Sequence, residues 1–528
     1  MIIIINMKQH AGVLILKNNR TYGHVKKQNG KEGKLLYKCI PNDNNIPSIL
    51  IPYEMKEIGF SKVFNNIYII FEFNETLLNK DKDTDTDTDI KIIGTLTQSL
   101  GSVEVIYNFF EYQLYCKNIH NSIQFFNKET FKQVKNLKEL EIKQLFMNKY
   151  PSIQDRTREQ IFSIDPEDCC DFDDAFSIKH IDNSNILLSI YISNVSIWLD
   201  YLNLFESFSH RISTIYLPNK KISMLPSILS DCFCSLKANC DRIAFVMDIT
   251  LNENHKIIYI NYYNSVINIY KNYVYDSKEL IKDENYILLL NTVKKIHTKY
   301  PLISCIHDSH YLVEYLMVFM NCYTGLEMKK FNNGIFRSLK IKEPIIGPII
   351  GLPNELLFLN NNGGIYVDYN KEKAVSHELL MIDSYIHITS PIRRIVDLLN
   401  IIQLQINLGL IELNKKASIF LFKWLNDLEY INNNMNSIKK VQNESKLLHL
   451  ITINPKLIDE IYDAIVTEIE IVEKNGIYCY NCYISKLKMF SRLKTREELN
   501  EYQKINIKLY LFNNEAKYKK KIKIELNR

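Results

Sequence analysis

The stretch SIDPEDCCDFDDAFS, residues 163–177, carries the strongest chemical signal in the chain. Its aspartates stand among isoleucine, phenylalanine and alanine side chains, so we expect the carboxylates to be partly buried. They are Asp165, Asp171, Asp173 and Asp174. Two like unit charges about 4 Å apart repel by roughly 4 kcal/mol at an effective dielectric constant near 20. Protons or cations must therefore neutralise this cluster.

A cluster that offers only oxygen ligands favours magnesium or manganese over zinc. Magnesium held by carboxylates is a common apparatus for displacement at phosphorus, because it lowers the pKa of a bound water and neutralises charge on the phosphoryl oxygens. A solvated turn whose aspartates cap a helix or border a strand fits the spacing alone equally well.

The composition is that of a globular protein with a sizeable core. Of 528 residues, 46% are hydrophobic and 24% charged, and the length suggests roughly three or four domains. The net charge of +5 is too small to identify a nucleic-acid partner. No apolar run is long enough for a membrane span, and the start lacks the pattern of a signal peptide. The 11 scattered cysteines are typical of reduced thiols, so we expect a cytoplasmic protein.

The chain alternates between β-rich ends and a mixed middle. Short aliphatic and aromatic runs, separated by turn residues, predict one small barrel over residues 1–62 and a second barrel with a linker over 63–150. Within the second segment, residues 103–116 are interpreted as a strand. Residues 151–451 mix strands with long amphipathic helices and predict an α+β body. Residues 452–528 return to β alternation with a lysine-rich edge and predict another small barrel.

Three minor motifs have simpler explanations than metal binding. The acidic run DTDTDTD, residues 83–89, lacks the glycine and glutamate that a calcium loop needs, and we interpret it as a solvated loop. Cys479 and Cys482 form a pair without a second ligand pair at suitable spacing, and the same holds for His307 and His310. We expect both pairs to be structural.

Further motifs follow the aspartates in a fixed order. They are RISTIYLP at 211–218, MLP at 224–226, LSDCFCSL at 229–236, DRIA at 241–244, LVEYLM at 312–317, YIHITSPIRR at 385–394 and DLL at 397–399. Together with residues 163–177, this series resembles the RNB domain of the ribonuclease II and ribonuclease R family, which includes the exosome-associated eukaryotic members. The resemblance implies an RNB catalytic body flanked by small OB-type barrels.

The resemblance also implies an activity. It is that of a magnesium-dependent (or manganese-dependent) hydrolytic 3′-to-5′ exoribonuclease that degrades single-stranded RNA processively to nucleoside 5′-monophosphates. The four aspartates would hold the metal, and loss of Asp173 would stop the chemistry while RNA stays bound. We expect a monomer that works with an RNA-decay complex. The alternative is a catalytically silent relative that binds RNA as a clamp or scaffold, and the complete set of aspartates favours the nuclease.

Four other residues match RNA-contacting positions of the family. Arg393 falls on the arginine that contacts the phosphate and the charge developing in the transition state, and Arg394 shares its motif. Tyr216 matches an aromatic that stacks near the last bases, and Glu314 matches a carboxylate near the terminal nucleotide. The segment YISNVS, residues 191–196, departs from the His-Ile-Ala-Asp-Val-Ser that many members carry, which leaves peripheral RNA contacts open but not the aspartates.

Overall fold

A computed structural model describes the chain in two compact units. The described residues are 8–26, 32–55, 64–75, 92–182, 184–338, 364–371, 384–473 and 476–527. The first unit comprises Met1–His120, Tyr216–Lys220 and Asn436–Arg528, and the second comprises Asn121–Ile215 and Lys221–Met435. Helices and strands are mixed in both units, which confirms the α+β, multidomain fold class. The acidic run at 83–89 lies outside the described residues.

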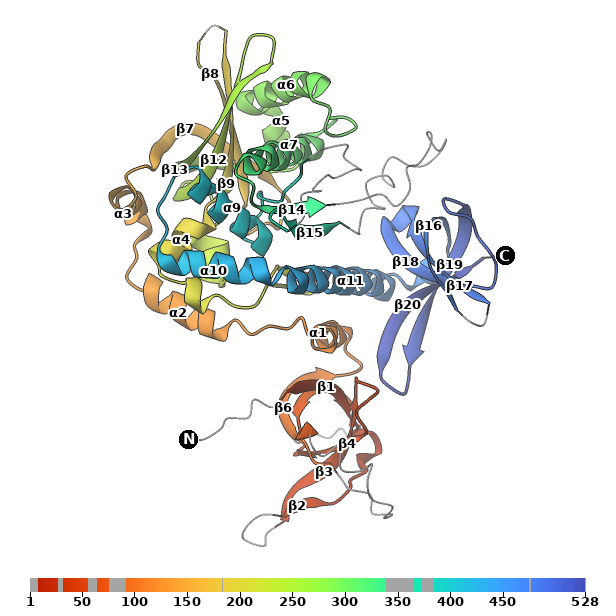
Figure 1. Ribbon diagram of the computed structural model, residues 1–528. Helices are drawn as coiled ribbons and strands as arrows, with labels where there is room; N and C mark the ends of the chain where they lie inside the picture. Colours follow the sequence, from red (N-terminus) through yellow and green to blue (C-terminus); the bar gives the residue numbers. More distant parts are fainter. Residues whose placement is uncertain are drawn as a thin grey trace. The chain divides into compact units, whose positions relative to one another are not determined.

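The second unit is built around a closed five-stranded barrel (Figure 1). Its strands are β7 (Gln154–Asp165), β8 (Asp174–His180), β9 (Ile186–Ser193), β12 (Asp241–Leu251) and β13 (Ile257–Val274), in the order β12-β13-β7-β8-β9. β9 pairs with β12 and closes the ring. Because β7 and β8 are antiparallel neighbours, the end of β7 and the start of β8 lie at the same end of the barrel. Asp165 and Asp174 occupy these two positions.

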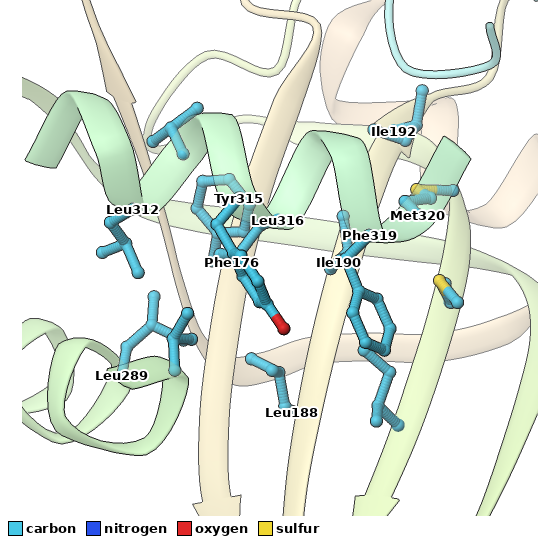
Figure 2. Packing of buried hydrophobic residues seen from close by; sticks show 14 of the residues in the cluster. Phe176, Leu188, Ile190, Ile192, Leu289, Leu312, Tyr315, Leu316, Phe319 and Met320 are labelled. Atoms are coloured by element: carbon cyan, nitrogen blue, oxygen red, sulfur yellow. The ribbon is translucent and has the colours of Figure 1, made fainter. Parts of the chain in front are cut away.

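The barrel strands carry apolar residues on both of their faces, so both the inside and the outside of the barrel are packed. On β7 to β9, Phe162, Phe176 and Ile190 join one buried cluster, while their neighbours Ala175 and Tyr191 join another. Side chains alternate between the faces of a strand, so both faces are buried here. Figure 2 shows the first cluster, in which strand residues pack against Leu289 and against Leu312, Leu316, Phe319 and Met320. Each such side chain contributes about 1.5–3 kcal/mol when fully buried.

Helices and a short strand pair complete the second unit. The helices are α2 (Gln124–Val134), α3 (Ile142–Lys149), α4 (Val195–Tyr201), α5 (Lys278–Lys282), α6 (Glu284–Lys299), α7 (Ser309–Lys330), α9 (Ile395–Asn407) and α10 (Lys415–Asn426). β14 (Ile335–Ser338) pairs with β15 (Ile365–Asp368). The short π-helix η5 (Leu229–Phe233) follows the hairpin of β10 (Ile215–Leu217) and β11 (Lys220–Ile222), of which residues 216–220 belong to the first unit. α6 and α7 supply the helical side of the cluster in Figure 2.

A buried ion pair also ties strands of the barrel together. Arg156 on β7 donates to both carboxylate oxygens of Asp248 on β12, at 2.8 and 2.6 Å, and Ser189 on β9 donates to the same carboxylate at 2.6 Å. The side chains of Arg156 and Asp248 are each 9% exposed. A bidentate pair with an added hydroxyl satisfies the buried charges, so it fixes the register of these strands.

The first unit begins with a single six-stranded sheet. Its strands are β1 (Gln9–Leu14), β2 (His24–Lys26), β3 (Glu32–Pro41), β4 (Ile49–Tyr53), β5 (Ile67–Glu72) and β6 (Thr95–Ser102). β1 pairs with β5 over six residue pairs. The sequence pattern predicts separate barrels on either side of residue 62, whereas the structure joins strands from both sides in one sheet. Pairing between distant strands cannot be read from the alternation within each of them.

The interpretation of residues 103–116 as a strand is wrong. This segment forms α1 (Ile106–Cys116), which buries Phe109, Phe110, Tyr112 and Leu114. Its aromatic residues favour strands by propensity, but a short apolar run does not distinguish a strand from a buried helix.

The first unit also contains a closed barrel near the end of the chain. Its strands are β16 (Ile461–Glu473), β17 (Ile477–Ile484), β18 (Met489–Thr495), β19 (Lys504–Asn514) and β20 (Lys519–Leu526), in the order β16-β17-β18-β20-β19. The long helix α11 (Leu428–Ile453) leads into it. Cys479 and Cys482 lie buried on β17. Among the helices in the described part of the chain, none has the length and apolar character that crossing a bilayer requires.

Candidate active site

Two strand ends and one loop carry the four aspartates in the second unit. Asp165 is the last residue of β7, Asp174 is the first of β8, and Asp171 and Asp173 lie on the loop between them. The loop starts with a turn in which the Cys169 N–H donates to the Pro166 carbonyl at 3.1 Å. The pairing of β7 with β8 therefore returns the chain to the same end of the barrel, where the aspartates gather.

Asp173 is the most firmly held of the four. Its side chain is 3% exposed, and its two oxygens accept from the Ile392 N–H and from the Arg393 Nε, each at 3.0 Å. Its backbone carbonyl accepts from the Ser193 N–H at 2.8 Å. Burial raises the pKa of Asp173 to about 7 although Arg393 opposes the rise. Asp173 is thus held in place by contacts with Ser193 and with residues 392–393, which are far apart in the sequence.

Asp165 and Asp174 each keep a buried oxygen without a hydrogen-bond partner among the described residues, and in both cases it is Oδ2. Burial raises the pKa of Asp165 to about 6, with a further contribution from Asp171. The pKa of Asp174 is raised well above its usual range, first by burial and then by the charges of Asp165 and Asp173. Unpaired, mutually repelling carboxylates are costly, which indicates a site shaped for positive charge.

Asp171 faces a lysine. Its Oδ1 lies 3.2 Å from the Lys221 Nζ on β11, and the same ammonium lies 3.0 Å from Asp231 Oδ1 on η5. The Ser230 hydroxyl donates to Asp231 Oδ1 at 2.8 Å. Lys221 therefore bridges two carboxylates at the edge of the cluster.

These four side chains offer the donor set of a magnesium site. Carboxylate oxygens are the ligands that magnesium prefers, and the unpartnered oxygens of Asp165 and Asp174 fit that use. Within the part of the chain that the structure describes, no three His, Cys, Asp or Glu side chains form a ready metal-binding group. Asp171 and Asp173 are instead paired with Lys221 and Arg393, so ligation by all four would require these pairs to rearrange.

The neighbouring arginines Arg393 and Arg394 have different surroundings. Arg393 is 46% exposed, with its Nη2 donating to the Ser390 hydroxyl at 3.0 Å while its Nε holds Asp173. Arg394 Nη2 donates at 2.8 Å to Asp397, which is fully buried. Asp397 also accepts from the Ser390 N–H at 2.8 Å. Arg393 thus presents part of its guanidinium to solvent at the aspartates, whereas Arg394 holds the loop that carries it.

Glu314 and the pair His307 and His310 lie around the start of α7. Glu314 is exposed and follows His310 by one helical turn. His310 stacks on Tyr275, with ring centroids 3.8 Å apart. His307 meets Tyr311 edge to face, so both histidines have aromatic partners.

Tyr275 is a residue that sequence reasoning missed. Its N–H donates to the Asp165 carbonyl at 3.1 Å. The pKa of its hydroxyl is raised, first by burial and then by the charges of Asp174 and Asp165. Its position follows from β13, which ends at Val274 beside Asp165 on the parallel strand β7. In a chain with 33 tyrosines, no local sequence signal distinguishes it.

The first unit has its own concentration of basic side chains, which we call the basic cluster. It comprises Lys117, Lys440, Arg492, Lys519 and Lys521. Desolvation and the charges of Lys117, Lys521 and Arg492 lower the pKa of Lys440, with Glu444 opposing. Basic side chains that lower one another's pKa lie close together, and such a concentration of positive charge attracts anions. Tyr216 lies in the same unit on β10; the residue is 43% exposed, and its N–H donates to Gln442 at 2.8 Å.

Comparison with known families confirms the resemblance seen in the sequence. Residues 153–299 match the RNB domain. The human exosome complex exonuclease RRP44 is 36% identical over 121 residues, which cover 23% of this chain and 13% of that protein. Ribonuclease R of Chlamydia pneumoniae is 34% identical over 126 residues, covering 24% and 19%. The matched stretches thus span less than a fifth of these relatives.

Solved structures extend the similarity of fold to nearly the whole chain. Mycoplasma genitalium RNase R in complex with ribose-methylated single-stranded RNA superimposes with a TM-score of 0.68 and 15% identity, covering 99% of this chain and 90% of that one. Yeast Ssd1, described as a pseudonuclease, gives a TM-score of 0.55 and 13% identity, covering 93% and 65%.

Proposed function

Because residues 153–299 are an RNB domain, we propose that the chain is a magnesium-dependent exoribonuclease. It would hydrolyse single-stranded RNA processively from the 3′ end and release nucleoside 5′-monophosphates. The observation that carries the proposal is the buried aspartate cluster, in which Asp165 and Asp174 keep unpartnered oxygens beside Asp173 and its arginine.

Asp165, Asp171, Asp173 and Asp174 would hold magnesium, with manganese as the alternative ion. When bound, the metal would supply an activated water and neutralise charge on the phosphoryl oxygens. The chain's own contribution is to keep the four carboxylates together at one end of the barrel, where burial disfavours the charge of Asp165, Asp173 and Asp174. This stored repulsion would favour binding of a divalent cation.

Arg393 would orient the phosphate. In the metal-free chain its Nε is held by Asp173 and one terminal nitrogen by Ser390, and the Ser390 contact would keep the guanidinium oriented when Asp173 turns to the metal. A preorganised fork stabilises charge on phosphate oxygens without further reorganisation. Arg394, held by Asp397, would support that loop rather than contact RNA directly.

The strand would be held by further side chains. Tyr216 offers an exposed ring for stacking, worth about 1–3 kcal/mol per base. The basic cluster of the first unit would contact phosphates, and Glu314 would lie near the terminal nucleotide. We further propose a cytoplasmic monomer that acts alongside an RNA-decay complex.

The test is an incubation of RNA labelled at either end with the full chain, in magnesium and in EDTA. We expect mononucleotides to leave the 3′ end in magnesium and no decay in EDTA. Asp173→Asn should bind RNA while releasing at least about 1000-fold less product, since it removes a proposed metal ligand and the charged partner of Arg393. Asp168→Asn, an exposed change in the same loop, is the matched control and should be fully active. Internal cuts, or decay that survives Asp173→Asn, would contradict the proposal.

A second candidate is a silent RNA-binding relative, which the structural similarity to a pseudonuclease makes worth testing. Tight RNA binding without any decay by the unaltered chain would favour it. The presence of all four aspartates favours the nuclease.

A further inference from the structure

Lys221 occupies an unusual position beside the aspartate cluster. Its ammonium lies 3.2 Å from Asp171 Oδ1 and 3.0 Å from Asp231 Oδ1. The side chain of Asp171 is only 9% exposed, so the ammonium at hydrogen-bond distance acts on a carboxylate that is largely shielded from water. Asp231, held in turn by Ser230, keeps Lys221 in place from the other side.

A divalent ion on Asp171 would meet a positive charge already present. Both cations would share one carboxylate, and their repulsion would lower the affinity of the site for the ion. Asp231 offers the ammonium a second acceptor, so Lys221 can remain near the site after it yields Asp171.

We propose that Lys221 is a positioning residue, a resident cation that holds Asp171 in place and weakens divalent-ion binding by the aspartate cluster. The proposal rests on the proposed function, because it takes Asp171 as a metal ligand. Lys221 would set the metal concentration at which the aspartate cluster binds the ion, and it would not contact RNA.

The expected size follows from Coulomb's law. A unit charge and a divalent ion about 6 Å apart, screened as in water, repel by an amount equivalent to roughly tenfold in affinity. Lys221 is 26% exposed, so screening as in water gives the smallest repulsion to be expected. Removal of the charge should therefore tighten metal binding by at least about tenfold.

The experiment measures Mn²⁺ binding by the full chain, using the electron paramagnetic resonance signal of free Mn²⁺ without RNA. Lys221→Met is compared with Lys220→Met, which makes the same change on the adjacent residue of β11. Lys220 pairs with Glu111 at 2.6 Å instead of with Asp171, and neighbouring strand residues point to opposite faces. Asp174→Asn defines the binding that depends on the cluster.

We expect Lys221→Met to bind Mn²⁺ at least about tenfold more tightly than Lys220→Met, and Lys221→Arg, which keeps the charge, to bind like the unaltered chain. In EDTA, Lys221→Met should unfold at a lower temperature than Lys220→Met, because Asp171 and Asp231 lose the ammonium that lies between them. If Lys221→Met folds poorly, Lys221→Gln replaces it.

Equal or weaker Mn²⁺ binding by Lys221→Met would overturn the proposal, as would tight binding by Lys221→Arg. Tighter binding by Lys221→Met in a chain that degrades no RNA would support the role of Lys221 and would refute only the nuclease activity. The two proposals can therefore fail separately.

Discussion

Replacing Asp165 by asparagine should stabilise the metal-free chain. Asp165 is 9% exposed, one of its oxygens has no partner among the described residues, and burial raises its pKa from 3.8 to about 6. At roughly 1.4 kcal/mol for each pH unit, this rise corresponds to about 3 kcal/mol of unfavourable free energy once the group is ionised. Asparagine has nearly the same shape and carries no charge, so Asp165→Asn should recover a large part of that amount.

The effect of Asp165→Asn on the free energy of unfolding should depend on pH. Between about pH 4 and pH 6 the folded carboxyl binds more protons than the unfolded one, so the free energy of unfolding falls as the pH rises through this window. The advantage of Asp165→Asn should therefore be small at pH 4 and complete at pH 7. Relief of repulsion on Asp174 would add to it.

The measurement is urea or thermal unfolding in EDTA at both pH values. Asp168→Asn, an exposed aspartate in the same loop, serves as the control for loss of one negative charge. Saturating Mg²⁺ should reverse the order, because metal stabilises only the chain that binds it. An Asp165→Asn chain that is less stable at pH 7 in EDTA, or equally shifted at both pH values, would refute the argument.

Three further perturbations have definite expected outcomes. Arg393→Lys should lower kcat on labelled RNA by about 100-fold with little change in KM. A lysine ammonium lacks the planar set of donors that lets arginine bind Asp173 and a phosphate at the same time. An unchanged kcat would exclude this role for Arg393. Asp248→Asn should lower the free energy of unfolding in urea by about 3–5 kcal/mol, because it leaves the charge of Arg156 buried without its partner. Adding Arg156→Met to this variant should restore part of the lost stability. Additive losses would argue against a coupled pair. Lys440→Gln should reduce the slope of log affinity for single-stranded RNA against log salt by about 0.7, as expected for one lost phosphate contact; an unchanged slope would remove Lys440 from the RNA surface.

The gathering of the aspartates was predictable from sequence, because they are close in the chain. Asp165 and Asp174 border a single loop, so a local pattern was enough to bring them together. Long helices within residues 151–451 were equally predictable, and α7 is one of them. The N-terminal end of α7 is capped by Asp308, whose carboxylate accepts from the Tyr311 N–H at 3.1 Å.

Features that depend on distant contacts were not predictable. Lys220 and Lys221 are indistinguishable in sequence, yet one pairs with Glu111 and the other with Asp171. The N-terminal strands gave no sign that β1 would pair with β5 across the expected domain boundary. The error over α1 has the same origin, because only packing decides whether a short aromatic-rich run forms a helix or a strand.

The bond between Asp173 and Arg393 has a consequence for synthesis, because the two residues are 220 positions apart. At about 5–20 residues per second, a ribosome needs roughly 10–40 seconds to add the arginine after the aspartate. Throughout this interval the nascent polypeptide contains the loop with Asp171 and Asp173 but still lacks Arg393, the residue proposed to bind the phosphate. Under the proposed function, we therefore expect RNA hydrolysis to begin only after Arg393 has been added and the second unit has folded.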